Sequence, residues 1–183
     1  MIKDYPHEIL WEFTLKCNKN CLYCGSKDVL NKSNESKFTH EHIANQIIKV
    51  HPDEVTITGG EPSVEFDELV KCVKILKEAD INVKILTNGN LFKISKGELD
   101  PYISQYGFSV NTEEDLNQEF DHLIPKEKTT IITNFGKHNF NIFNKIAKYA
   151  AQFSCWQVQL TIGNKCQLDL YEIQELQERV KKV

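Results

Sequence analysis

Three cysteines lie close together near the amino end of the chain, in the stretch KCNKNCLYCG. Cys17, Cys21 and Cys24 have the spacing C-x-x-x-C-x-x-C, and Gly25 follows directly. Cysteine thiolates are ligands of zinc and of iron–sulfur clusters. Thiols so close together in sequence indicate a metal site. Because the segment contains only three cysteines, the absence of a fourth ligand helps to distinguish which metal it holds.

Two kinds of metal site are compatible with three thiols in one loop. A structural zinc ion needs four protein ligands, so a Cys or His from elsewhere would have to complete it. A cubane iron–sulfur cluster is wrapped by cysteines at similarly close spacing, four of them in the bacterial ferredoxin run. An iron without a protein ligand can instead accept a substrate or cofactor. The spacing favours a reactive iron–sulfur cluster over zinc or a chance grouping.

The composition of the chain indicates its number of domains, its possible partners and its location. The chain has 183 residues, 40% of them hydrophobic and 26% charged, with a formal net charge of -4. That length buries the core of one ordinary domain, so we expect a single domain over residues 1–183. Lysines are interleaved with acidic residues, which argues against bulk nucleic-acid binding. Neither a signal-peptide pattern nor a run of about 18 uncharged apolar residues occurs, so we expect a cytoplasmic protein without a membrane partner.

The remaining cysteines are separated from the group. In a reducing compartment, the six cysteines of the chain are not expected to form disulfides. Cys72 lies in a helical pattern, where a small buried hydrophobic side chain is the ordinary role of a free cysteine. We extend the same interpretation to Cys155 and Cys166.

Apolar runs of strand type alternate with amphipathic helical stretches along the whole chain. Strands are expected over 8–15, 54–60, 82–89, 106–111, 129–136 and 156–162. Helices are expected over 40–50, 66–79, 95–105 and 141–153, and Thr39 is the expected N-cap of the first. A last helix is expected at the carboxyl end, with Ile173, Leu176 and Val180 facing the core. Residues 112–125 are expected to form a short acidic helix and a loop. The alternation predicts βα units and a parallel sheet. The chain has room for six such units, whereas a full eight-unit barrel needs about 250 residues.

A second motif follows the strand expected over 54–60. The sequence TGGEP contains Gly59, Gly60, Glu61 and Pro62. Two glycines let backbone carbonyls approach a ligand closely, and a carboxylate can accept a hydrogen bond from an ammonium. Taken alone, the motif is equally compatible with a tight turn.

Together the two motifs resemble a known family. C-x-x-x-C-x-x-C after a first strand, with Tyr23 before the third cysteine and GGEP one βα unit later, is similar to the signature of the radical S-adenosylmethionine (radical SAM) enzymes. The resemblance covers essentially the whole chain and implies the family's partial (β/α)6 TIM-type barrel. It also implies that Cys17, Cys21 and Cys24 bind a [4Fe–4S] cluster, whose fourth iron chelates the methionine part of S-adenosylmethionine.

The same resemblance assigns further cofactor contacts. It places Gly59, Gly60 and Glu61 against the methionine amino group, and Tyr23 against the adenine through its backbone. Polar residues also end the later strands, where parallel barrels hold their sites. The candidates are Thr87 and Asn88, Ser109 and Asn111, Thr133 and Asn134, and Gln157, Gln159 and Thr161. Of these, the resemblance favours Ser109, Asn111 and Asn134 as cofactor contacts.

The chemistry implied by the family is reductive cleavage of S-adenosylmethionine to a 5′-deoxyadenosyl radical, which abstracts hydrogen from a substrate. A one-electron reductant of the flavodoxin or ferredoxin type is therefore an expected partner. The stretch WQVQLTI resembles a strand of peptide-modifying members, which commonly add a cysteine-rich domain where this chain ends. We expect a peptide or protein substrate, as in a truncated peptide maturase or a glycyl-radical activating enzyme.

Two other functions are also compatible with the sequence. A minimal small-molecule enzyme of the 7-carboxy-7-deazaguanine synthase type would also fit the length of the chain. A non-catalytic iron–sulfur or zinc module is the alternative outside enzymes. Such a carrier has no need of GGEP or of polar strand ends around a cavity, so the sequence argues against it.

Overall fold

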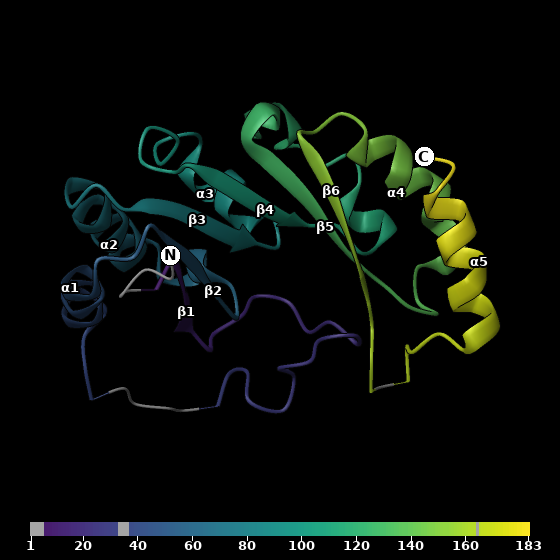
Figure 1. Cartoon of the computed structure of the whole chain (residues 1–183), viewed down its shortest axis with the longest axis horizontal. Helices are drawn as coiled ribbons and strands as arrows, with labels where there is room; N and C mark the ends of the chain where they lie inside the picture. Colours follow the sequence, from purple (N-terminus) through teal and green to yellow (C-terminus); the bar gives the residue numbers. More distant parts are fainter. Residues whose placement is uncertain (1–5, 33–36, 164) are drawn as a thin grey trace.

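Six parallel strands form one sheet, in which each strand pairs with the next one along the chain (Figure 1). The computed structural model describes residues 6–32, 37–163 and 165–183. The strands are Glu8–Thr14 (β1), Glu54–Gly59 (β2), Asn82–Thr87 (β3), Gln105–Ser109 (β4), Thr129–Phe135 (β5) and Cys155–Leu160 (β6). This order is the one that successive βα units produce, as the sequence predicts.

Helices connect the strands and pack beside the sheet. They are His40–Val50 (α1), Phe66–Glu78 (α2), Asn90–Ser95 (α3), Phe143–Ala150 (α4) and Leu170–Val180 (α5). Helices α1 and α2 lie side by side near the first strands, and α4 and α5 lie near the last ones (Figure 1). In the part of the chain that the structure describes, no helix has the length and apolar character to cross a membrane.

The sequence predicts the first two helices well. The Thr39 hydroxyl accepts a hydrogen bond from the His42 N–H, so Thr39 is the N-cap of α1, as expected. Helix α2 buries Leu69, Val73 and Leu76 on one stripe. Cys72 is also fully buried there, which confirms its role in packing.

Three later helices differ from the prediction. The helix expected over 95–105 lies earlier, as α3, because Lys96 and Gly97 adopt left-handed backbone angles with φ of 46° and 88°. The acidic segment over 112–125 forms two short 3₁₀ turns, Glu113–Asp115 and Asp121–Leu123, with Asn117 in a left-handed conformation between them. Helix α4 is shorter than the helix expected over residues 141–153.

Only part of the inward-facing apolar stripe predicted for the carboxyl-terminal helix is buried. Leu176 is buried and Ile173 packs against the core. Val180 is 37% exposed, because it occupies the last turn of α5.

The parallel arrangement brings the carboxyl ends of the strands to one edge of the sheet. Residues 15–32, which follow β1, leave from this edge and run along the lower side of the view in Figure 1. A register shift between Glu12 and Thr14 bends β1 just before that segment, and Thr14 pairs with Gly59 at the end of β2. Bulges of this kind redirect a strand and are frequent next to active sites.

Candidate functional site

The three predicted cluster ligands lie on the segment after β1. Cys17, Cys21 and Cys24 are free thiols, and each side chain is half-buried. Asn31 closes this segment, because its N–H donates to Leu15 O over 2.9 Å and its side-chain oxygen accepts from the Cys17 N–H over 2.9 Å. Within the described residues, no three cysteine, histidine or carboxylate side chains converge around one point as metal ligands do.

The sulfur of Cys17 contacts the residue that follows β3. The N–H of Lys19 points at it over 3.4 Å, and the side-chain amide of Asn88 reaches it over 3.9 Å. Burial raises the pKa of the Cys17 thiol, and the hydrogen bond from Lys19 opposes that rise.

The two glycines of GGEP hold the ends of β1 and β2 together. The N–H of Gly60 donates to Thr14 O over 2.6 Å, and the N–H of Glu61 donates to Lys16 O over 2.8 Å. A Cβ atom on Gly60 would lie only 2.1 Å from Lys16 O, and Gly59 has a φ of 124°. Glycine is required here because the backbone that leads into Cys17 passes in direct contact.

The carboxylate of Glu61 points inward and is fully buried. It accepts hydrogen bonds from the N–H and hydroxyl of Ser63, from the Thr87 hydroxyl, and from the N–H of Asn88 over 2.7 Å. Burial raises the pKa of Glu61, and these hydrogen bonds oppose the rise. The side chain predicted to meet a ligand's ammonium group thus connects the turn after β2 to the turn after β3.

Two of the polar residues predicted at the ends of β4 and β5, Asn111 and Asn134, belong to one hydrogen-bond network. Asn111 is buried, and its side-chain oxygen accepts from the Asn134 N–H over 2.7 Å. Asn139 donates to the carbonyls of both residues and accepts from the Gly136 N–H. Ser109 lies half-buried at the end of β4. These contacts fix the strand ends relative to each other.

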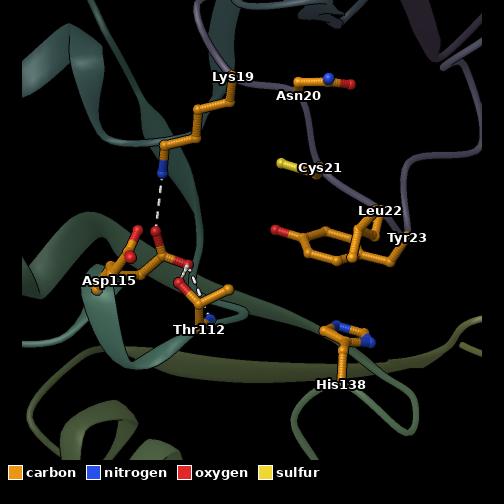
Figure 2. Close-up of a pocket in the computed structure, with 9 residues that line it drawn as sticks. Lys19, Asn20, Cys21, Leu22, Tyr23, Thr112, Asp115 and His138 are labelled. Atoms are coloured by element: carbon orange, nitrogen blue, oxygen red, sulfur yellow. Dashed lines mark hydrogen bonds and ion pairs between the residues drawn. The ribbon is translucent and has the colours of Figure 1, made fainter.

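A cavity of about 340 Å³ lies between the cysteine segment and the ends of β4 and β5. The residues drawn in Figure 2 include Lys19, Cys21, Tyr23, Asp115 and His138. The rings of Tyr23 and His138 stack with centroids 4.4 Å apart and an interplanar angle of 12°. Neither ring nitrogen of His138 has a hydrogen-bond partner among the described residues, and burial lowers the pKa of this histidine.

The Tyr23 phenol points toward the Cys21 side chain in the same cavity (Figure 2). Burial raises the pKa of Tyr23, and its side-chain hydrogen bond with Cys21 adds to the rise. The phenol therefore stays protonated and presents a donor to the cysteine sulfur.

An ion pair crosses the edge of this cavity. The Lys19 ammonium lies 2.7 Å from the Asp115 carboxylate and also donates to Asn88 O over 3.2 Å. Asp115 in turn accepts from the N–H groups of Asn111 and Thr112. A smaller cavity of about 220 Å³ lies on the far side of the pair, beside Phe108 and Phe120.

Four residues of the site are not predicted from the sequence: Lys19, Asp115, His138 and Asn139. Lys19 could have been noticed, because it lies between two predicted ligands. Thr112 and Asp115 form a capping box in the structure, and their spacing T-x-x-D is a known signal for one. His138 and Asn139 follow β5 without any local pattern that marks them.

The donor set has the chemistry of an iron–sulfur site. Three free thiols lie on one segment, and thiolates hold such clusters with potentials set partly by hydrogen bonds to the sulfurs. The neighbouring cavity has polar groups on several sides, which suits a charged organic ligand. These residues are therefore compatible with a cluster and a bound cofactor.

A sequence model described as the radical SAM superfamily matches residues 11–153. The chain belongs to the radical SAM superfamily. The resemblance inferred from the cysteine segment and GGEP is confirmed, and the cofactors of this family are a [4Fe–4S] cluster and S-adenosylmethionine.

Curated radical SAM relatives match shorter stretches of the chain. A protein of Methanocaldococcus jannaschii named "Putative glycyl-radical enzyme activating enzyme" is 30% identical over 106 residues, which cover 55% of this chain and 44% of the relative. A 7-carboxy-7-deazaguanine synthase of Clostridium acetobutylicum is 34% identical over 77 residues, covering 41% of this chain and 34% of that protein.

Solved structures share the fold over nearly the whole chain. SuiB of Streptococcus suis with bound S-adenosylmethionine has a TM-score of 0.73 at 20% identity, covering 97% of this chain and 47% of SuiB. A second structure of SuiB contains the precursor peptide SuiA. This likeness confirms the partial (β/α)6 TIM-type barrel. The chain spans about half the length, or less, of the first relatives and structures it matches.

Proposed function

We propose that this chain is the catalytic core of a radical SAM enzyme in which Cys17, Cys21 and Cys24 hold the cluster. The observation that carries the proposal is that three free, half-buried thiols lie on one segment, which contacts the GGEP turn through Lys16 O and lines a cavity of about 340 Å³ with Cys21. Members of the family need a one-electron reductant. When bound, the cluster and S-adenosylmethionine supply the 5′-deoxyadenosyl radical that abstracts hydrogen from a substrate.

The residues of the chain have distinct roles in this proposal. The GGEP backbone is an acceptor surface for the methionine ammonium, since the Glu61 carboxylate is already surrounded by donors. Ser109, Asn111 and Asn134 supply polar groups at the ends of β4 and β5. Tyr23 offers its backbone to the adenine. The stacked rings of Tyr23 and His138 form a wall that limits water at the reacting centre.

We propose a peptide or protein as the substrate. Support comes from the relative named for activation of glycyl-radical enzymes and from the SuiB structure with its precursor peptide. Both proteins are longer than this chain, so a substrate-binding region outside it is compatible with the proposal. A flavodoxin or ferredoxin is the proposed reductant.

A small-molecule reaction is the second candidate. It is favoured by the 34% identity with a 7-carboxy-7-deazaguanine synthase, which is the higher identity of the two curated relatives described above. We further propose a cytoplasmic location, because a reducing compartment keeps free thiols available for a cluster.

The experiment that tests this function starts from anaerobic reconstitution with iron and sulfide. The cluster is reduced with dithionite, S-adenosylmethionine is added, and 5′-deoxyadenosine is measured. Formation of 5′-deoxyadenosine supports the radical enzyme. A stable cluster that never cleaves S-adenosylmethionine would instead indicate an electron carrier, and stoichiometric zinc without iron would indicate a structural site.

The substrate class is tested in the same assay. Candidate precursor peptides, a glycyl-radical enzyme and the small-molecule substrate of 7-carboxy-7-deazaguanine synthases are added separately. A true substrate raises the rate of 5′-deoxyadenosine formation and is itself changed in mass or acquires a radical signal. Stimulation by that small molecule alone would replace the peptide assignment with the small-molecule one.

A further inference from the structure

Asn88 stands between the GGEP turn and the cysteine segment. It is the first residue after β3, and its side chain is half-buried. Its backbone N–H donates to the Glu61 carboxylate over 2.7 Å. Its side-chain amide donates to the Asn18 side-chain oxygen over 2.8 Å and reaches the Cys17 sulfur over 3.9 Å. One residue thus contacts both motifs on which the radical SAM assignment depends.

The orientation of the Asn88 amide is fixed at both of its ends. Its oxygen accepts the N–H of Asn90 over 3.2 Å, which closes an Asx turn. With the oxygen engaged in this turn, the nitrogen of the same amide must face Asn18 and Cys17. The donor is therefore held toward the sulfur by the fold of the segment after β3, and not only by the cysteine segment.

The anchor behind Asn88 is a buried carboxyl group. Glu61 is fully buried and also accepts from the Thr87 hydroxyl, one residue before Asn88. The N–H and hydroxyl of Ser63 donate to the same group, so its position is fixed from several sides. The position of the Asn88 backbone is thus determined by Glu61, and the position of its side chain follows from the Asx turn.

A donor at a cluster-ligating sulfur acts on the energy of the cluster. One-electron reduction adds negative charge that is shared with the sulfurs, and a hydrogen-bond donor stabilises that charge. Hydrogen bonds to the sulfurs are among the factors that set the potentials of iron–sulfur clusters. Removing such a donor lowers the potential, so that a given reductant reduces a smaller share of the protein.

We propose that Asn88 is a positioning residue that raises the reduction potential of the cluster through its amide on Cys17, with Glu61 as its anchor. This inference rests on the proposed assignment of Cys17 as a cluster ligand. Asn88 is not itself a ligand, so the cluster should still assemble when its side chain is shortened.

The chain offers a variant that separates the donor from the turn. In Asn88→Ser the hydroxyl can still accept from the Asn90 N–H, as Ser does in ST turns, but it is too short to reach the Cys17 sulfur. Asn88→Gln keeps an amide donor on a longer side chain. Asn90→Ala is the matched control, because Asn90 has the same side chain in the same turn but donates to the Ser63 hydroxyl instead of a cysteine.

The experiment is a redox titration of each reconstituted protein with dithionite, followed by the electron paramagnetic resonance signal of the reduced cluster. Iron and sulfide content are measured first, and the wild-type content tests the proposed cluster independently. Asn88→Ser should hold a full cluster and show about a three- to tenfold lower ratio of reduced to oxidised cluster at a fixed potential. A tenfold change corresponds to about 59 mV for one electron. Asn88→Gln should recover most of this loss, and Asn90→Ala should titrate as the wild type does.

Two results would overturn the inference. A wild-type midpoint in Asn88→Ser with a full cluster would show that the amide does not act on the sulfur, while the cluster assignment would stand. Loss of the cluster in Asn88→Ser, with Asn90→Ala intact, would make Asn88 necessary for assembly and not a modulator of potential. Failure of the wild type to hold a [4Fe–4S] cluster would instead count against the proposed function itself.

Discussion

The backbone N–H of Asn88 donates to the Glu61 carboxylate over 2.7 Å, which ties the turn after β3 to the turn after β2. Ser63 and Thr87 add further donors to the same carboxylate. Because Glu61 is fully buried, each of these donors depends on it for a partner. The glutamate of GGEP is therefore part of the internal framework of the site.

Replacing Glu61 with Gln is expected to destabilise the protein. The amide of Gln would turn an NH₂ group toward a donor from which the carboxylate now accepts a hydrogen bond. Each buried donor left unpaired costs about 1–3 kcal/mol. Urea unfolding of the cluster-free protein measures this loss. Val64→Ala, one turn away at an exposed position, serves as the control and should unfold as the wild type does.

Replacing Glu61 with Ala separates this structural role from a direct contact with the cofactor. If the side chain contacted only the methionine ammonium, Glu61→Ala would leave the cluster-free protein as stable as the wild type. The affinity for S-adenosylmethionine would then fall about ten- to hundredfold, because a hydrogen bond to a charged group is worth about 1.5–3 kcal/mol. Urea unfolding and cofactor titration of Glu61→Ala distinguish the two roles.

Single replacement of Cys17, Cys21 or Cys24 by Ala should abolish the [4Fe–4S] cluster, because a site with three protein thiolates has no spare ligand. Iron content and the visible spectrum after anaerobic reconstitution measure the loss. Cys72→Ala is the matched control, since Cys72 is buried within α2. It should keep the cluster and lose about 1 kcal/mol of stability. A full cluster in any one of the first three variants would contradict the assignment.

Much of the fold could be predicted because its signals are local. The alternation in β1 and the stripe of α2 each report which face is buried, and Thr39 marks the start of α1. The position of α3 is not predicted correctly, because its end depends on the left-handed backbone of Lys96, a residue with no strong preference for that conformation. Hydrophobic periodicity does not contain that information.

The candidate site could be predicted only where residue type and spacing are themselves informative. Cys17 and Glu61 belong to motifs that are visible in a single stretch. The contacts between Asn88 and Cys17, and between Lys19 and Asp115, join residues from separate βα units. Such pairs depend on how the strand ends meet, and the sequence does not show which side chains of each end face one another.

Replacing Lys19 with Met should destabilise the protein, because the Asp115 carboxylate is only 5% exposed and would lose its cationic partner. We expect a loss of about 1–2 kcal/mol, below the 3–5 kcal/mol of a fully buried pair, because the Lys19 side chain is 37% exposed. Urea unfolding of Lys19→Met, Asp115→Asn and the double variant measures the coupling. Purely additive losses would show that the ion pair does not contribute.

The stability conferred by His138 should depend on pH. Burial lowers the pKa of His138 in the folded protein, whereas the unfolded chain binds the proton near pH 6.5. As the pH falls through that value, the unfolded state takes up the proton first, so the free energy of unfolding decreases. Each pKa unit of lowering is worth about 1.4 kcal/mol at pH values below both pKa values.

His138→Phe isolates this effect because Phe keeps an aromatic ring against Tyr23 and cannot be protonated. Urea unfolding of both proteins is compared at pH 8, 7, 6 and 5. Contributions from all other titrating groups largely cancel in the difference between the two curves. The wild type should lose stability relative to His138→Phe only below about pH 6.5, where the unfolded chain becomes protonated. A difference that stays constant over the whole range would show that the stacked histidine titrates as it does in water.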